Sequence, residues 1–177
     1  MRKATLLAGL LLLTGLPARA QDAPAAEIFA GYSLASVDLV VVRETFPYGF
    51  QFQVAANRGA GWGIVADFGA QFKSIAGVSL QTYEYMGGVR FVSRGENINA
   101  FTHMLFGAAT IRALGSSETG FAMGFGGGAD ISLNDRFSVR VIQFDYLPTR
   151  LDLFGTGGQW MNNIRLGAGI VFKAGGS

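Results

Sequence analysis

His103 is the only histidine in the chain, so a catalytic base of the histidine type would have to be this residue. A hydrolase with a serine–histidine–acid triad would also need a serine and a carboxylate from other segments. No serine lies two residues from His103, which favours a histidine that is held by structural hydrogen bonds. We therefore predict no catalytic residue and no enzymatic activity.

Six charged residues form a second candidate group, because all of them fall on the polar phase of segments in which apolar residues alternate. Charges that face a narrow interior are costly unless they are paired. A balanced set therefore predicts a hydrogen-bonded plug of ion pairs rather than a path for protons or ions. The group contains three acids and three arginines: Asp67, Glu84, Arg90, Asp130, Arg140 and Arg165.

Cofactor and metal chemistry finds little support in the residue types. The chain has no cysteine, which excludes disulfides, cysteine-ligated metals and a lipid-modified cysteine. The glycine-rich run 124–128 is similar in composition to a phosphate-binding loop, but no helical pattern follows it and Phe125 keeps the strand alternation. We predict no cofactor and no metal site.

The first twenty residues have the features of a secretory signal peptide. A basic start, Met1-Arg2-Lys3, is followed by an apolar run over 6–16 and by the cleavage pattern Ala18-Arg19-Ala20. The apolar run is shorter than the roughly 20 residues of a spanning helix. Cleavage after Ala20 leaves 11 basic and 12 acidic residues, so the mature chain lacks the excess of positive charge that is typical of nucleic-acid-binding proteins.

The remaining chain is poor in the residues that cover a soluble protein. Charged residues make up 15% of the sequence, against about 25% in a soluble domain. Only two lysines, Lys73 and Lys173, follow the signal peptide. Much of the exterior is therefore expected to face something other than water.

Alternation with a period of two residues predicts an all-β chain. It is regular in five segments and less regular in 27–35, 99–111 and 136–147, which makes about eight strands. In the last of these, Arg140 and Asp145 have opposite parity, so both face inward only if a bulge near Ile142 shifts the register. The regular segments are 49–57, 62–72, 83–92, 121–132 and 163–172.

The predicted connections alternate in length, which favours a single antiparallel up-and-down transmembrane β-barrel. Transmembrane barrels have short periplasmic turns and longer extracellular loops. Short links at 58–61, 93–98 and 133–135 alternate here with longer links at 36–48, 73–79, 112–119 and 148–159.

The chemistry of the two strand faces indicates which one is outside. The weaker face carries glycine, alanine, serine and glutamine with few charges, which suits the filling of a narrow interior. The bulky face would then contact lipid. Aromatic residues near predicted strand ends would form the interfacial girdles: Trp62, Phe72, Tyr83, Phe91, Phe101, Phe121, Phe137 and Phe172.

With its signal peptide and eight segments over 27–172, the chain resembles the small OmpA/OmpX-like outer-membrane β-barrel domain. This resemblance implies a short N-terminal segment at 21–26, the barrel at 27–172 and a tail at 173–177. The closing strand is similar to the signal that the barrel-assembly machinery reads in this family, which implies that machinery as a partner during biogenesis. The matching positions are Arg165, Gly167, Ile170 and Phe172.

We expect a bacterial outer-membrane protein with a side-chain-filled lumen and a structural or surface-interaction role. Its partners would be membrane lipid, lipopolysaccharide and an unknown surface ligand, the last reached by extracellular loops such as 37–48 with Phe46, Pro47 and Tyr48. Two alternatives remain open. One is an outer-membrane enzyme that modifies lipid A with His103, and the other is a soluble periplasmic binder of the lipocalin type.

Overall fold

The computed structural model describes residues 23–39, 42–58, 61–75, 77–152 and 157–175. This part of the chain folds into β-strands, and no helix within it has the length and apolar character needed to cross a membrane. The predicted signal peptide, 1–20, and its cleavage after Ala20 lie outside the described residues. The strands are β1 (Ala26–Asp38), β2 (Arg43–Phe46), β3 (Tyr48–Arg58), β4 (Trp62–Ile75), β5 (Val78–Arg94), β6 (Ile98–Ala113), β7 (Ser116–Ser132), β8 (Phe137–Leu151) and β9 (Gln159–Ala174).

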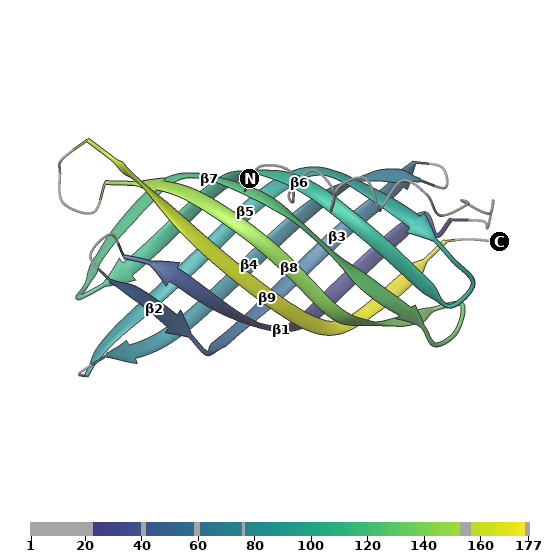
Figure 1. The fold of residues 1–177 in the computed structure, drawn as a ribbon, viewed down its shortest axis with the longest axis horizontal. Helices are drawn as coiled ribbons and strands as arrows, with labels where there is room; N and C mark the ends of the chain where they lie inside the picture. The colour runs from purple at the N-terminus through teal and green to yellow at the C-terminus, as the bar shows by residue number, and fades with distance from the viewer. Residues whose placement is uncertain (1–22, 40–41, 59–60, 76, 153–156, 176–177) are drawn as a thin grey trace, which may run out of the picture.

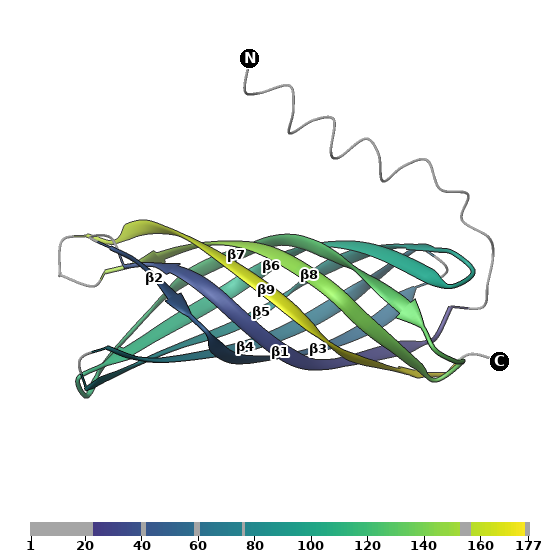
Figure 2. The same cartoon turned by 60° about the horizontal axis from the view of Figure 1, so that its bottom comes forward.

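The strands form one closed antiparallel sheet. From β3 to β9 each strand pairs with the next in sequence, and β1 pairs with both β3 and β9. The β1–β9 ladder runs from Ala26 opposite Ala174 to Ser36 opposite Ile164, which closes the cylinder. Figure 1 and, from a second side, Figure 2 show the strands inclined to the long axis of an elongated barrel, as closure requires. We call the end where β1 begins and β9 ends the near end, and the opposite end the far end.

β2 and β3 act as two parts of one barrel strand. Both pair with β1, and only Pro47 separates them. Proline has no backbone N–H to donate to a ladder, so the strand is interrupted there. The barrel therefore has eight strands, and the predicted fold class is confirmed.

The two faces of the sheet carry the residues that the alternation predicted. Phe50, Phe125 and Ile170 are exposed on the exterior, whereas the neighbouring Gln51 is 1% exposed and points inward. Aromatic rings from β3, β4 and β5 form a continuous exterior patch, with Phe50 and Phe68 centroids 5.7 Å apart and Phe68 and Tyr85 centroids 5.3 Å apart. The exterior is therefore apolar over the middle of the barrel.

An irregularity in β8 explains how Arg140 and Asp145, which have opposite parity in the sequence, face the same side of the sheet. The register with β9 shifts between Arg140 and Gln143, and Val141 and Ile142 both face outward. A bulge adds one residue to a strand and reverses the faces beyond it. As a result both Arg140 and Asp145 are completely buried in the interior.

One of the predicted girdle aromatics lies elsewhere. Phe101 is 3% exposed and faces the lumen, where the inward-facing Phe29 of β1 is also buried. The Arg140 guanidinium lies over both rings. Its Cζ is 4.1 Å from the centroid of Phe101 and 4.2 Å from the centroid of Phe29. The attraction between a cation and an aromatic face stabilises these two rings inside the barrel. The other girdle candidates keep the outward parity of their strands.

The long loops predicted at 36–48, 73–79 and 112–119 are wrong, because strands continue through most of the described residues in them. In the link predicted at 148–159, β8 continues to Leu151 and β9 begins at Gln159, while 153–156 lie outside the described residues. β4 and β5 extend over 73–75 and 78–79, and β6 and β7 meet at a two-residue turn of Leu114 and Gly115. Both turn residues have positive φ, 52° and 79°, as a tight hairpin turn requires. Segment 37–48 likewise contributes the end of β1, all of β2 and the first residue of β3. Hydrogen bonds between the strands pair the backbone groups there, even though apolar and polar residue types no longer alternate along the chain.

The barrel also extends beyond its predicted limits of 27 and 172. Ala26 belongs to β1, and Lys173 and Ala174 belong to β9, because the ladder between these strands continues to their ends. The backbone N–H of Lys173 donates to the carbonyl of Arg136 at 2.7 Å. The segments predicted as an N-terminal stretch and a tail are thus shortened.

Candidate functional site

Arg165 is the centre of the interior charge network. Its Nη2 donates to Asp67 at 2.9 Å and to Asp145 at 2.8 Å, and its Nη1 lies 3.5 Å from Glu84. These side chains come from β4, β5, β8 and β9, and the guanidinium is fully buried. One guanidinium with a planar array of donors therefore joins three carboxylates across the lumen.

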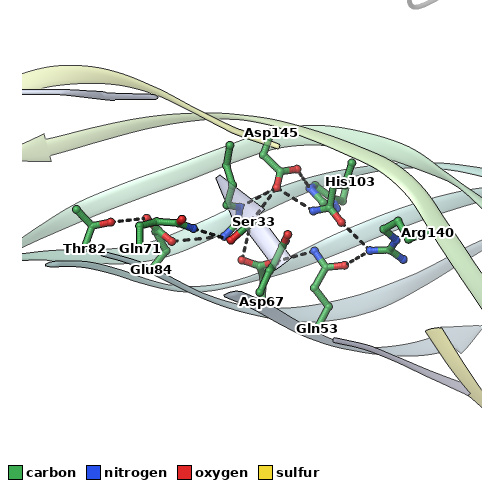
Figure 3. Close-up of polar contacts among 12 residues, drawn as sticks. Ser33, Gln53, Asp67, Gln71, Thr82, Glu84, His103, Arg140 and Asp145 are labelled. Atoms are coloured by element: carbon green, nitrogen blue, oxygen red, sulfur yellow. Dashed lines mark hydrogen bonds and ion pairs between the residues drawn. The ribbon is translucent and has the colours of Figure 1, made fainter. Parts of the chain in front are cut away.

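His103 belongs to the same network through Asp145. Its Nε2 lies 2.8 Å from Asp145 Oδ1, while Gln143 donates to the other carboxylate oxygen at 2.8 Å. His103 of β6 and Asp145 of β8 lie on either side of Gly126 of β7 in the sheet, and Figure 3 shows the imidazole beside this carboxylate. The histidine is 3% exposed. The arrangement can hold the carboxylate in place.

A second group surrounds Arg140. Its Nε and Nη2 donate to Asp130 at 2.8 and 3.1 Å, which is the bidentate geometry of a strong arginine–carboxylate pair. Arg90 lies 3.6 Å from the same carboxylate. Arg90 also forms an ion pair with Glu27 at 2.6 Å, and Arg94 forms one with Glu27 at 2.8 Å.

Glutamines connect the two groups. Gln53 donates to Asp67 at 2.6 Å and accepts from Arg140 at 2.6 Å, a contact drawn in Figure 3. Gln143 accepts from Arg140 at 2.6 Å and donates to Asp145. The structure thus places all six sequence candidates in the lumen and joins them in one continuous network of hydrogen bonds and ion pairs.

Glu27 and Arg94 were missed from the sequence. Glu27 begins an irregular segment and shares its face with the bulky Phe29. The sequence therefore did not show which face of this segment is the polar one. Arg94 continues the phase of Arg90 and Val92, but it falls in the link predicted at 93–98. Extending the alternation of β5 by two residues would have found it.

Glycines on the facing strands leave the space that this network occupies. A Cβ at Gly69 would collide with the carboxylate of Glu84 and the guanidinium of Arg165. A Cβ at Gly126 would collide with Asp145 and with the backbone carbonyl of Phe144. The inward glycines of the run 124–128 therefore leave room for larger side chains of neighbouring strands.

Apolar side chains pack inside the barrel toward the far end. Phe46, predicted in an exposed loop, is fully buried against Ala35 and Val37. A second cluster joins Ile111, Leu151 and Met161, and Leu39 packs on both clusters. A further inward cluster contains Ala55, Val65, Met86, Leu105, Ala109, Ala122 and Leu147.

The remaining sequence candidates lie in β9. Arg165 and Gly167 face the lumen, whereas Ile170 and Phe172 are exposed on the exterior, so the four positions alternate as a strand requires. Their role in assembly stays a prediction. Within the described ranges, no group of three or more acidic or histidine side chains is arranged to hold a metal ion.

The closed sheet, the apolar exterior and the filled, ion-paired interior together define a small eight-stranded β-barrel of the outer-membrane type. No family model matches the sequence, and a comparison with curated proteins found no match.

Solved structures show the same fold. Neisserial surface protein A (NspA) superposes with a TM-score of 0.66 at 12% identity, over 84% of this chain and 97% of that one. Ail, the attachment invasion locus protein of Yersinia pestis, has a TM-score of 0.53 at 19% identity, over 85% and 99%. Ail in complex with the heparin analogue sucrose octasulfate gives 0.52 at 18% identity over the same shares. The chain therefore has the fold of small outer-membrane barrels.

Proposed function

We propose that this protein is an integral outer-membrane barrel with a structural or surface-interaction role and no enzymatic activity. The observation that carries the proposal is the apolar exterior of a sheet that the β1–β9 ladder closes into a cylinder, which suits lipid and does not suit water. By the usual orientation of such barrels, the near end would face the periplasm and the far end the outside.

The soluble alternative requires a polar exterior. Instead, large apolar side chains are exposed on every barrel strand, among them Phe52, Trp62, Phe106 and Phe144. The enzymatic alternative requires an accessible histidine, whereas His103 is buried and its acid partner Asp145 is shared with Arg165. The apolar exterior therefore speaks against the soluble binder, and the buried histidine speaks against the enzyme.

Membrane integration is tested by fractionation and by migration on a detergent gel. We expect the protein to stay with the outer-membrane fraction after osmotic shock and to migrate differently before and after boiling, because a closed barrel resists unfolding in detergent. Release of the protein without detergent, with identical migration of heated and unheated samples, would refute the proposal.

A closed interior predicts that solutes do not cross the barrel. A barrel of eight strands has an interior just wide enough for side chains. Here ion pairs lie in the interior, and the clusters around Phe46 and Met161 pack inside it toward the far end. In planar bilayers we expect no stable conductance steps, under conditions in which a general porin conducts. Regular, reproducible steps from the purified protein would show that the lumen opens.

A surface role is supported by the shape of the far end. β5 and β7 are 17 residues long, against the roughly 9–11 residues that cross a bilayer, so their far ends would project from the membrane. The Ail structure with sucrose octasulfate shows that one barrel of this fold carries an anionic saccharide. We expect lipopolysaccharide and an extracellular ligand to contact this projecting part.

A further inference from the structure

A hollow of about 620 Å³ lies between the tips of the β4–β5 and β6–β7 hairpins. Its lining includes the outward residues Ser79, Gln81, Arg112 and Ser117. Residues of the inward phase, Val78, Ala113 and Ser116, line it only at the hairpin tips, and Leu80 and Ile111, one step further along the strands, do not line it. The hollow is therefore on the exterior of the projecting sheet, and its volume is in the range of about 300–1,000 Å³ that is typical of small-molecule sites.

Three of its polar side chains form a lateral row across neighbouring strands. Gln81 of β5 is opposite Arg112 of β6, which is opposite Ser117 of β7. Arg112 is the only charged residue among the described lining residues. The hollow thus combines one guanidinium with amide and hydroxyl groups and contains no carboxylate, which is the composition of a site for an anion.

Tyr83 positions two members of this row. Its ring lies under the Arg112 guanidinium, 5.2 Å from ring centroid to Cζ. Its hydroxyl donates to Gln81 Oε1 at 2.8 Å, so the NH₂ of that amide points away from Tyr83. Arg112 and Gln81 are therefore both held as hydrogen-bond donors.

The hollow lies directly beyond the aromatic exterior of the barrel. Phe72 is opposite Gln81 in the ladder, and its ring packs on Tyr83 at 6.2 Å and on Phe50 at 6.2 Å. An occupant could thus place acyl chains along the aromatic patch and an anionic head in the hollow. Arginine is well suited to binding phosphate oxygens in a bidentate way.

We infer that this hollow, the Arg112 site, binds the phosphorylated sugar headgroup of an outer-leaflet glycolipid. The inference rests on the proposed function, because it needs the far end to face the outer leaflet. It adds to that function a defined lipid site with Arg112 as the phosphate-binding residue and Tyr83 as its positioning residue.

The test measures binding of bisphosphorylated lipid A to the folded protein in detergent micelles by native mass spectrometry. We expect Arg112→Gln to weaken binding about tenfold, as loss of one charge-assisted contact does. Dephosphorylated lipid A should bind weakly to both proteins. Tyr83→Phe keeps the ring and removes the hydroxyl, so a smaller loss is expected.

Arg150→Gln is the matched control, because Arg150 is also exposed on the exterior of the sheet and does not line the hollow. An equal loss in Arg150→Gln would overturn the site in favour of general charge attraction. Binding of sucrose octasulfate that depends on Arg112, with lipid A binding unchanged in Arg112→Gln, would overturn the lipid source. Gel migration of each variant reports folding separately, so a failed site is distinguishable from a failed membrane barrel.

Discussion

Replacing Arg165 by methionine is expected to destabilise the barrel by about 3–5 kcal/mol, because it leaves buried carboxylates without their shared cation. Arg165 contacts Asp67, Glu84 and Asp145, and each of these is less than 10% exposed. Water cannot replace the lost guanidinium without entering a filled interior. The midpoint of urea unfolding in lipid vesicles, followed by gel migration, measures the effect.

Two further variants make this result specific. Arg150→Met removes an exposed arginine and should leave the midpoint nearly unchanged. Adding Asp67→Asn and Asp145→Asn to Arg165→Met should recover part of the stability, because neutral amides need no cation. If Arg165→Met unfolds at the same urea concentration as the unmodified protein, the network does not stabilise the fold.

Phe52→Arg is expected to destabilise the inserted barrel by about 2–4 kcal/mol, the cost of arginine on the lipid face near the bilayer midplane. Phe52 is exposed on the exterior in the middle of β3, opposite Phe68 of β4. The same vesicle unfolding experiment measures the change. The large effect follows from moving a charge into hydrocarbon.

Tyr48→Arg provides the depth control. Tyr48 is also outward, but it lies at the far end of β3 where the aromatic patch ends, so a cost of only about 0–1 kcal/mol is expected. Equal and small effects at both positions would mean that the exterior faces water, which would contradict the membrane assignment.

The face of each strand was predictable from the sequence because side chains alternate strictly along an extended backbone. This rule placed Asp67, Glu84 and Arg90 inward, and it required the bulge that brings Arg140 and Asp145 to one face. The assignment of bulky residues to the outer face failed at Phe101, which alternates regularly with its strand but faces inward, since size alone does not reveal a guanidinium across the lumen.

The far end was predicted less well than the middle of the barrel. Alternation weakens where neither face contacts lipid, so the ends of β4 to β7 were interpreted as loops. Hydrogen bonds of the ladder depend on neighbouring strands and leave little trace in side-chain type.

By itself, the sequence determined an all-β chain with an apolar face, a small polar face and too few charges for a soluble exterior. Only the tertiary structure decided which charges meet. Arg165 reaches Asp67 across 98 positions and Arg94 reaches Glu27 across 67. Such pairs depend on the register and closure of the whole sheet, because the lumen brings together walls that are distant along the chain. Local spacing specifies the face of each residue, and closure of the barrel specifies its partner.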